Sequence, residues 1–162
     1  MNKKKYIDLR SDTVSLPNEA MIKAIQEAKL GDDVLGEDPT VNQLEKEAAE
    51  KLGKEAALLV PSGTFGNQAA IYTHTKRGDE IIAADPAHIV QYEVGAAASI
   101  SGVQLRSIQS EDGYITAEQL REKIRAEADI HYPETGLIVV QNPLGNGRVV
   151  PPNVLAEIKE TA

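Results

Sequence analysis

Short apolar runs alternate with amphipathic helical patterns along this chain, and that alternation limits the folds open to it. The apolar runs, typical of buried strands, occupy residues 56–60, 80–84, 103–108 and 136–140. The helical patterns around them occupy residues 17–29, 40–52, 64–76, 89–99 and 116–128. Because strands that alternate with helices form βαβ units, the sequence predicts an α/β fold, with a mostly parallel sheet and helices on its faces.

The strand patterns begin only after the first 50 residues. We therefore expect residues 1–50 to form an N-terminal arm and helices, and residues 51–162 to belong to the α/β domain. Three later helices are expected to begin at residues whose side chains are good N-caps, namely Thr40, Thr116 and Asn153. The last of these helices reaches Ala162 without a Gly, Asn or Pro to end it. Two interpretations stay open: the chain is the front part of a longer domain, or its C-terminal helix frays.

The acidic, cysteine-free composition argues against several classes of protein. The chain has 17 Lys and Arg against 25 Asp and Glu, a net charge of −8, which disfavours a nucleic-acid partner. It has no cysteine, which excludes a disulfide framework, a thiolate metal site and a cysteine nucleophile. No apolar run approaches the roughly 20 residues of a membrane span, and no signal-peptide core follows the first residues. We expect a cytoplasmic protein with no membrane partner.

In parallel α/β sheets, ligands bind beyond the carboxyl ends of the strands. After the first predicted strand, Ser62-Gly63-Thr64 forms a turn that opens a helix. Backbone N–H groups at a helix start, with two hydroxyl groups beside them, suit a phosphate. The same residues are equally typical of a plain N-cap, with Ser62 or Thr64 capping the helix.

Two more strand ends carry polar groups. After the second predicted strand, His88 opens a helix, with Tyr92 one turn later on the same face and Glu93 beside it. An imidazole there is suited to stacking on a flat ring or to moving a proton, although a buried structural histidine is the plainer interpretation. After the fourth predicted strand, Gln141 begins a loop rich in Asn and Gly, while His131 lies in the loop before that strand.

A phosphate turn and a ring-stacking histidine together suggest a phosphorylated aromatic cofactor such as pyridoxal phosphate, which normally needs a lysine. The lysines of this chain are Lys3, Lys4, Lys5, Lys23, Lys29, Lys46, Lys51, Lys54, Lys76, Lys123 and Lys159. None of them follows a predicted strand among pocket-like residues, so the sequence predicts no anchor for the cofactor. The three histidines are scattered and make no metal-binding pattern.

Several short motifs occur together in one order. They are Leu9-Arg10-Ser11-Asp12-Thr13-Val14, Gly31-Asp32-Asp33-Val34, Gly36-Glu37-Asp38-Pro39-Thr40, Gly53-Lys54-Glu55-Ala56-Ala57, Pro61-Ser62-Gly63-Thr64, Arg77-Gly78-Asp79-Glu80, Ala87-His88, Tyr92-Glu93 and Asp129-Ile130-His131. Together they resemble the N-terminal half of the low-specificity L-threonine aldolases, which are fold-type I pyridoxal-phosphate enzymes. The resemblance implies an incomplete three-layer α/β/α large domain, pyridoxal 5'-phosphate as cofactor, and a homotetramer with active sites shared between subunits.

The resemblance also implies roles for individual residues. Ser62, Gly63 and Thr64 match the family's phosphate-binding turn. His88 matches the histidine that stacks on the cofactor ring and is implicated in proton transfer. His131 matches a histidine near the substrate hydroxyl group. Ser11 matches a serine that helps to hold the substrate carboxylate, and Tyr92 and Glu93 match residues close to the pocket.

The activity implied is cleavage of a small β-hydroxy amino acid, L-threonine or L-allo-threonine, to glycine and acetaldehyde. Leu35 stands where the family usually has Tyr, and Gln141 where it commonly has Glu. The family's Schiff-base lysine has no counterpart in this chain, so the chain by itself is expected to be inactive. Two alternatives stay open: another fold-type I lyase, β-eliminating or acting on a different β-hydroxy amino acid, and a non-catalytic half-domain.

Overall fold

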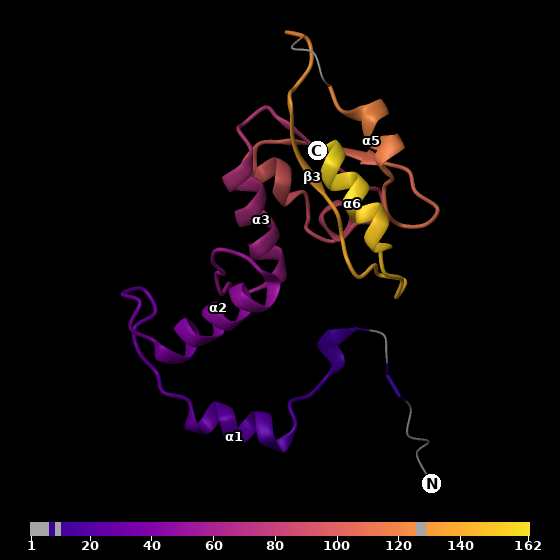
Figure 1. Ribbon diagram of the computed structural model, residues 1–162. Coiled ribbons are helices and arrows are strands. Elements are labelled where there is room, and N and C mark those ends of the chain that lie inside the picture. The colour runs from indigo at the N-terminus through magenta and orange to yellow at the C-terminus, as the bar shows by residue number, and fades with distance from the viewer. Residues whose placement is uncertain (1–6, 9–10, 126–128) are drawn as a thin grey trace. The chain divides into compact units, whose positions relative to one another are not determined.

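The computed structural model describes residues 7–8, 11–125 and 129–162 (Figure 1). The chain divides into two compact units, Met1–Leu59 and Val60–Ala162. Residues 126–128, which end the helix predicted over 116–128, lie outside the described residues. Among the residues that are described, no helix is long and apolar enough to cross a membrane.

The first unit is helical. It contains a 3₁₀ turn η1 (Asp12–Val14) and the helices α1 (Glu19–Glu27) and α2 (Pro39–Leu52), so both predicted helices are confirmed. The expected cap of α2 is wrong. The Asp38 carboxylate caps it by accepting from the N–H groups of Thr40 and Val41, and the Thr40 hydroxyl donates instead to the carbonyl of Lys29.

The strand predicted over residues 56–60 is absent from this structure. A strand requires a backbone ladder, and the N–H of Leu59 donates instead to the Glu45 carboxylate, at 2.7 Å. The Leu58 side chain is 75 % exposed, so the apolar run is not buried as the prediction required. Apolar composition indicated burial here, but only a pairing partner makes a strand.

The second unit is built on a three-stranded parallel sheet. Its strands are β1 (Glu80–Ala84), β2 (Gln104–Ile108) and β3 (Thr135–Val139), in the order β2-β1-β3. The three strand predictions over these regions are therefore confirmed to within one residue at each end. Because β1 is central, every residue of that strand is buried. Alternate residues of β1 point to opposite faces of the sheet.

Helices cover both faces of this sheet. Ile81 and Ala83 pack in one cluster with Ile71 of α3 (Gly63–His74), α4 (His88–Gln91) and the π-helical segment η2 (Ala97–Ser101). Ile82 and Ala84 pack in a second cluster with α5 (Ala117–Lys123) and α6 (Pro152–Thr161), which lie side by side in Figure 1. The result is a three-layer α/β/α arrangement.

Three helix predictions in this unit need correction. The helix expected over 89–99 is two pieces, α4 and η2, because Val94 and Gly95 take positive φ angles of 53° and 69° between them. Helix α5 ends at Lys123, since Ile124 is extended. Asn153 does not cap α6, which begins one residue earlier, directly after Pro151.

Candidate active site

A pocket of about 220 Å³ lies just beyond the carboxyl ends of β1 and β3. Its lining residues come from α3, from the start of α4, and from the end of β3 with the chain after it. They are Asn67, Ala87, His88, Ile89, Val139, Val140, Gln141 and Asn142. This is the edge of a parallel sheet where ligands collect. Two of the predicted strand ends, those carrying His88 and Gln141, meet here.

His88 is held at both its backbone and its ring. Its backbone N–H donates to Gln141 Oε1 at 2.7 Å, and its Nδ1 lies 2.9 Å from Glu93 Oε1. The imidazole and the Tyr92 ring have centroids 5.4 Å apart and are tilted by 49°. The His88 side chain is 48 % exposed, so it is not the buried structural histidine of the plainer interpretation.

Glu93 has a fully buried carboxylate. Besides His88, it accepts from Asn67 Nδ2 and Gln68 Nε2, each at 2.6 Å. Burial raises the pKa of Glu93, but the hydrogen bonds from Asn67, His88 and Gln68, with the charge of His88, outweigh burial and bring the pKa below its ordinary value. Glu93 therefore stays a carboxylate at neutral pH.

The predicted phosphate turn lies at the amino end of α3. Ser62 is the N-cap, and its Oγ accepts from the N–H of Phe65 at 3.1 Å. Ser62, Gly63 and Thr64 are all exposed. A Cβ built on Gly63 meets no atom within 4 Å, so the space over this turn is open. Helix α3 packs on the sheet and ends shortly before β1 starts, so its amino end points toward the carboxyl edge of the sheet.

The turn and His88 do not line one cavity. Ser62 and Thr64 line a separate apolar groove of about 630 Å³ along α3, together with Phe65, Gln68, Ala69, Tyr72, Thr73, Ala96 and Ile100. Asn67, one turn after Gly63, lines the His88 pocket. Consecutive residues of α3, Asn67 and Gln68, thus face the two cavities, and both donate to Glu93.

Two predicted site residues do not line this pocket in the second unit. Ser11 belongs to the first unit, where its Oγ accepts from the N–H of Thr13. His131 is exposed and lies in the loop before β3, at the amino edge of the sheet, opposite the edge that carries His88. Its Nδ1 is 2.8 Å from Asp129 Oδ1. The backbone and ring N–H groups of His131 lower the pKa of Asp129.

Comparison with known proteins decides the family. A protein-family model described as "Beta-eliminating lyase" matches residues 8–162. The chain belongs to the beta-eliminating lyase family. It is 44 % identical over 161 residues to a probable low-specificity L-threonine aldolase 2 of Arabidopsis thaliana, covering 96 % of this chain and 45 % of that protein. It is 43 % identical over 155 residues to the low specificity L-threonine aldolase of Escherichia coli K12, covering 95 % and 46 %.

The chain therefore spans just under half the length of these relatives. A solved structure of a threonine aldolase from Leishmania major superposes with a TM-score of 0.58 at 20 % identity, over 62 % of this chain and 29 % of that one. At that identity the superposition shows the fold alone. It agrees with the α/β arrangement expected for a beta-eliminating lyase.

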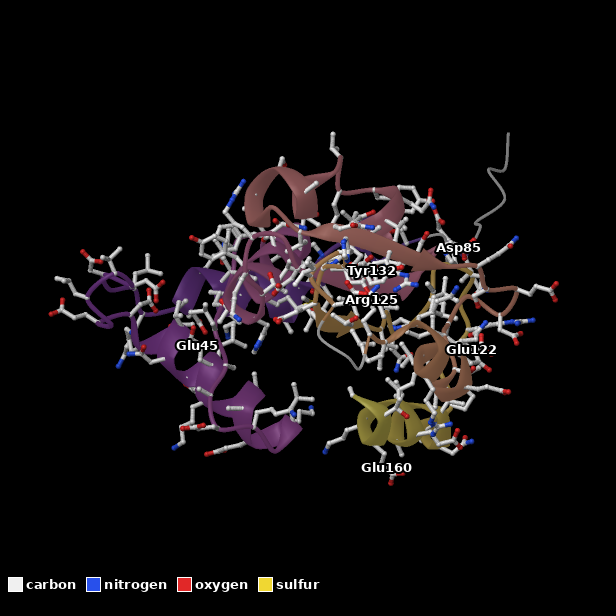
Figure 2. All side chains as sticks on the ribbon, turned by 90° about the horizontal axis from the view of Figure 1, so that it is seen from above. Glu45, Asp85, Glu122, Arg125, Tyr132 and Glu160 are labelled. Atoms are coloured by element: carbon white, nitrogen blue, oxygen red, sulfur yellow. The ribbon has the colours of Figure 1, made fainter. Side chains whose placement is uncertain are left out.

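One ionic cluster of this chain was not predicted from the sequence. Glu80, the fully buried first residue of β1, accepts from Arg106 Nη1 and the Thr135 hydroxyl, and Arg125 Nη1 lies 3.5 Å from its second oxygen. The Arg125 guanidinium sits 4.5 Å from the centre of the Tyr132 ring, and Figure 2 shows the two together. A glutamate opening an apolar strand gave no sign of this burial, because its partners come from three other segments.

Proposed function

We propose that this chain contributes to a pyridoxal-phosphate-dependent aldolase that cleaves a small β-hydroxy amino acid, L-threonine or L-allo-threonine, to glycine and acetaldehyde. The observation that carries the proposal is the pocket at the carboxyl edge of the sheet, lined by His88 and by Asn67 of α3, the helix whose amino end carries Ser62-Gly63-Thr64. The names of the relatives support the reaction class. We further propose that residues 51–162 form part of the cofactor-binding domain and that residues 1–50 form an N-terminal arm and helices.

The residues present suit part of this cofactor. The open space over Gly63 and the first-turn N–H groups of α3 suit a phosphate, and the half-exposed imidazole of His88 suits a flat ring. No lysine is among the residues that line the His88 pocket. The amine that would anchor the cofactor is therefore not supplied by those lining residues. We propose that it comes from a part of the protein beyond the segment shared with the relatives' first halves.

The roles of the chain's own residues follow from this fit. Pyridoxal phosphate, when bound, supplies a ring that takes up the electron pair released as the Cα–Cβ bond breaks. Thr64 and the first-turn N–H groups would hold its phosphate, and His88 would fix the ring plane and exchange a proton through its second ring nitrogen. Ser11 would hold the substrate carboxylate, and Tyr92 would border the substrate.

We propose a homotetramer in which a second copy completes the site. His131 lies before the amino end of β3 and His88 beyond the carboxyl end of β1. Five-residue strands separate these edges by about 16 Å, so one copy does not bring both histidines to one small substrate. A site that uses both histidines therefore takes His131 from a neighbouring subunit.

The test is a titration of the ¹⁵N-labelled chain with pyridoxal phosphate, followed by amide shifts. We expect the amides of Gly63, Thr64 and His88 to shift together. Pyridoxal, which lacks the phosphate, should move Gly63 and Thr64 much less. Thr64→Val, of the same shape but without the hydroxyl, should weaken binding roughly tenfold, the loss of one hydrogen bond to a charged group. Shifts confined to surface lysines, or equal shifts with pyridoxal, would count against the proposal.

A further inference from the structure

The Glu93 carboxylate makes more hydrogen bonds within the fold than a residue that contacts substrate would need. Its carboxylate is fully buried, and three donors, two on α3 and one on α4, are hydrogen-bonded to its two oxygens. Oε1 accepts from Asn67 and lies 2.9 Å from His88 Nδ1, while Oε2 accepts from Gln68. Because this carboxylate is fully buried and both of its oxygens already accept hydrogen bonds, a small molecule in the pocket does not reach it. Its effect on the site therefore passes through His88.

We propose that Glu93 is a positioning residue that holds His88 as the Nδ1–H tautomer, so that Nε2 is the nitrogen presented to the pocket. This inference deepens the proposed function: the catalytic role given to Nε2 rests on that function. The tautomer of the His88 ring does not, because it is a property of the chain alone.

The hydrogen bonds leave Glu93 only one way to meet His88. An ionised carboxylate only accepts hydrogen bonds. The side-chain amides of Asn67 and Gln68 already use their N–H groups on it. A lone pair on His88 Nδ1 facing Oε1 at 2.9 Å would be repelled, so Nδ1 must carry the hydrogen. The bond made by one ring nitrogen fixes the state of the other, which leaves Nε2 unprotonated in the neutral ring.

Burial indicates which edge of the ring is accessible. The Glu93 side chain is 0 % exposed, whereas the His88 side chain is 48 % exposed and lines the pocket. Since Nδ1 faces the buried carboxylate, the exposed half of the imidazole is the half that carries Nε2. The Gln141 bond to the His88 backbone and the Tyr92 ring contact fix the orientation further. The arrangement presents a proton acceptor to the pocket.

The experiment measures the tautomer directly. The chain is labelled with ¹⁵N at histidine, and long-range ¹H–¹⁵N correlations assign the protonated nitrogen of each neutral ring. His74→Gln and His131→Gln identify the His88 signals by elimination. We expect His88 to show a protonated Nδ1 and an unprotonated Nε2 without any cofactor. A protonated Nε2 in the neutral ring would overturn the proposal.

Variants separate positioning from folding. Glu93→Met keeps the approximate volume but removes the acceptor, and we expect the Nδ1–H form to stop being the major one. Glu93→Gln should retain that form, because Gln68 Oε1 has no partner and its amide can turn to accept from the introduced amide. Asp85→Asn is the matched control, since that carboxylate accepts from the N–H of Ser110 instead. Its His88 pattern should equal that of the wild type.

Each outcome has one meaning. If Glu93→Met retains the Nδ1–H form while folded, Glu93 does not set the tautomer and the proposal fails. If Glu93→Met does not fold, the wild-type chain and Glu93→Gln still decide it. If His88 shows the expected tautomer but pyridoxal phosphate does not shift the Gly63 and Thr64 amides, the proposed function fails and the positioning role of Glu93 stands.

Discussion

At the scale of single residues, both histidines that the sequence singles out have a carboxylate on Nδ1. His88 meets Glu93, whose side chain is 0 % exposed, and His131 meets Asp129, whose side chain is 47 % exposed. Solvent screens the second pair, so it contributes little to the free energy of folding. The buried Glu93 carboxylate has three donors, and loss of any of them would leave a buried charge less well solvated. The Glu93 network is therefore the one expected to affect stability.

Glu93 should make stability depend on pH in the acid range. Its pKa in the folded chain is below the ordinary value of 4.5. The stability that this carboxylate contributes is thus fully present above pH 4.5 and is lost as pH falls through the lower, folded value. Glu93→Gln does not titrate there. We expect the free energy of unfolding of the wild type to exceed that of Glu93→Gln by roughly 1–3 kcal/mol at pH 7, and this difference to shrink progressively as the pH is lowered below 4.5. Urea unfolding at several pH values measures this, and a gap that stays constant with pH would contradict it.

The sequence located the histidines but not what holds them. His88 and Tyr92 are separated by one helical turn, a spacing that a sequence displays, and their rings do meet. The partners of Glu93 are 25 and 26 residues away, and Gln141 is 53 residues from His88. The first contacts depend on how α3 packs on the sheet, and the last depends on how β1 and β3 pair. Spacing alone could not give them, nor the burial of Glu80 among Arg106, Arg125 and Thr135.

At the scale of elements, local signals succeeded where the chain supplies its own hydrogen-bond partners. Thr116 caps α5 as expected, and Gln119 completes a reciprocal capping box. The run over residues 56–60 failed because a strand needs a partner elsewhere. The prediction of a single helix over 89–99 is wrong because Val94 adopts a positive φ, a conformation that its β-branched side chain gives no reason to expect. Local hydrogen-bond partners thus help to determine where a helix begins, whereas whether a strand forms depends on a pairing partner elsewhere in the chain.

The capping box of α5 gives a quantitative test. Thr116 Oγ1 accepts from the N–H of Gln119, and Gln119 Oε1 accepts from the N–H of Thr116. Thr116→Ala leaves both of these bonds weakened or lost, so we expect a loss of about 1 kcal/mol in the free energy of unfolding. Chemical denaturation measures it. Glu122→Ala, at an exposed position of α5 labelled in Figure 2, should change stability by less than about 0.5 kcal/mol. Equal effects of the two variants would argue against a role for the cap.

At the scale of the whole molecule, the residues assigned to chemistry are distributed over separate regions. Ser11 is in the first unit, and His88 and His131 are at opposite edges of the sheet in the second. β3 is an outer strand of the described sheet, and a shallow pocket runs along it to the end of α6. An outer strand presents unpaired backbone groups. The chain thus holds the His88 pocket on a sheet whose outer strand β3 has backbone groups free to pair with a further strand.

This distribution predicts that the 162-residue chain alone lacks aldolase activity. Cleavage needs an anchored cofactor, and the residues lining the His88 pocket include histidine, amides and apolar groups but no lysine. With pyridoxal phosphate and L-threonine supplied, we expect no acetaldehyde above the level given by the cofactor alone.

A full-length relative serves as the positive control. Supplying the part of such a relative that this chain does not match as a separate polypeptide should raise activity if the two polypeptides assemble, and His88→Ala in this chain should then lower the restored rate. Threonine-dependent acetaldehyde from the chain alone would show that the pocket is complete as it stands, and that the lysine is dispensable or is drawn from outside the lining residues.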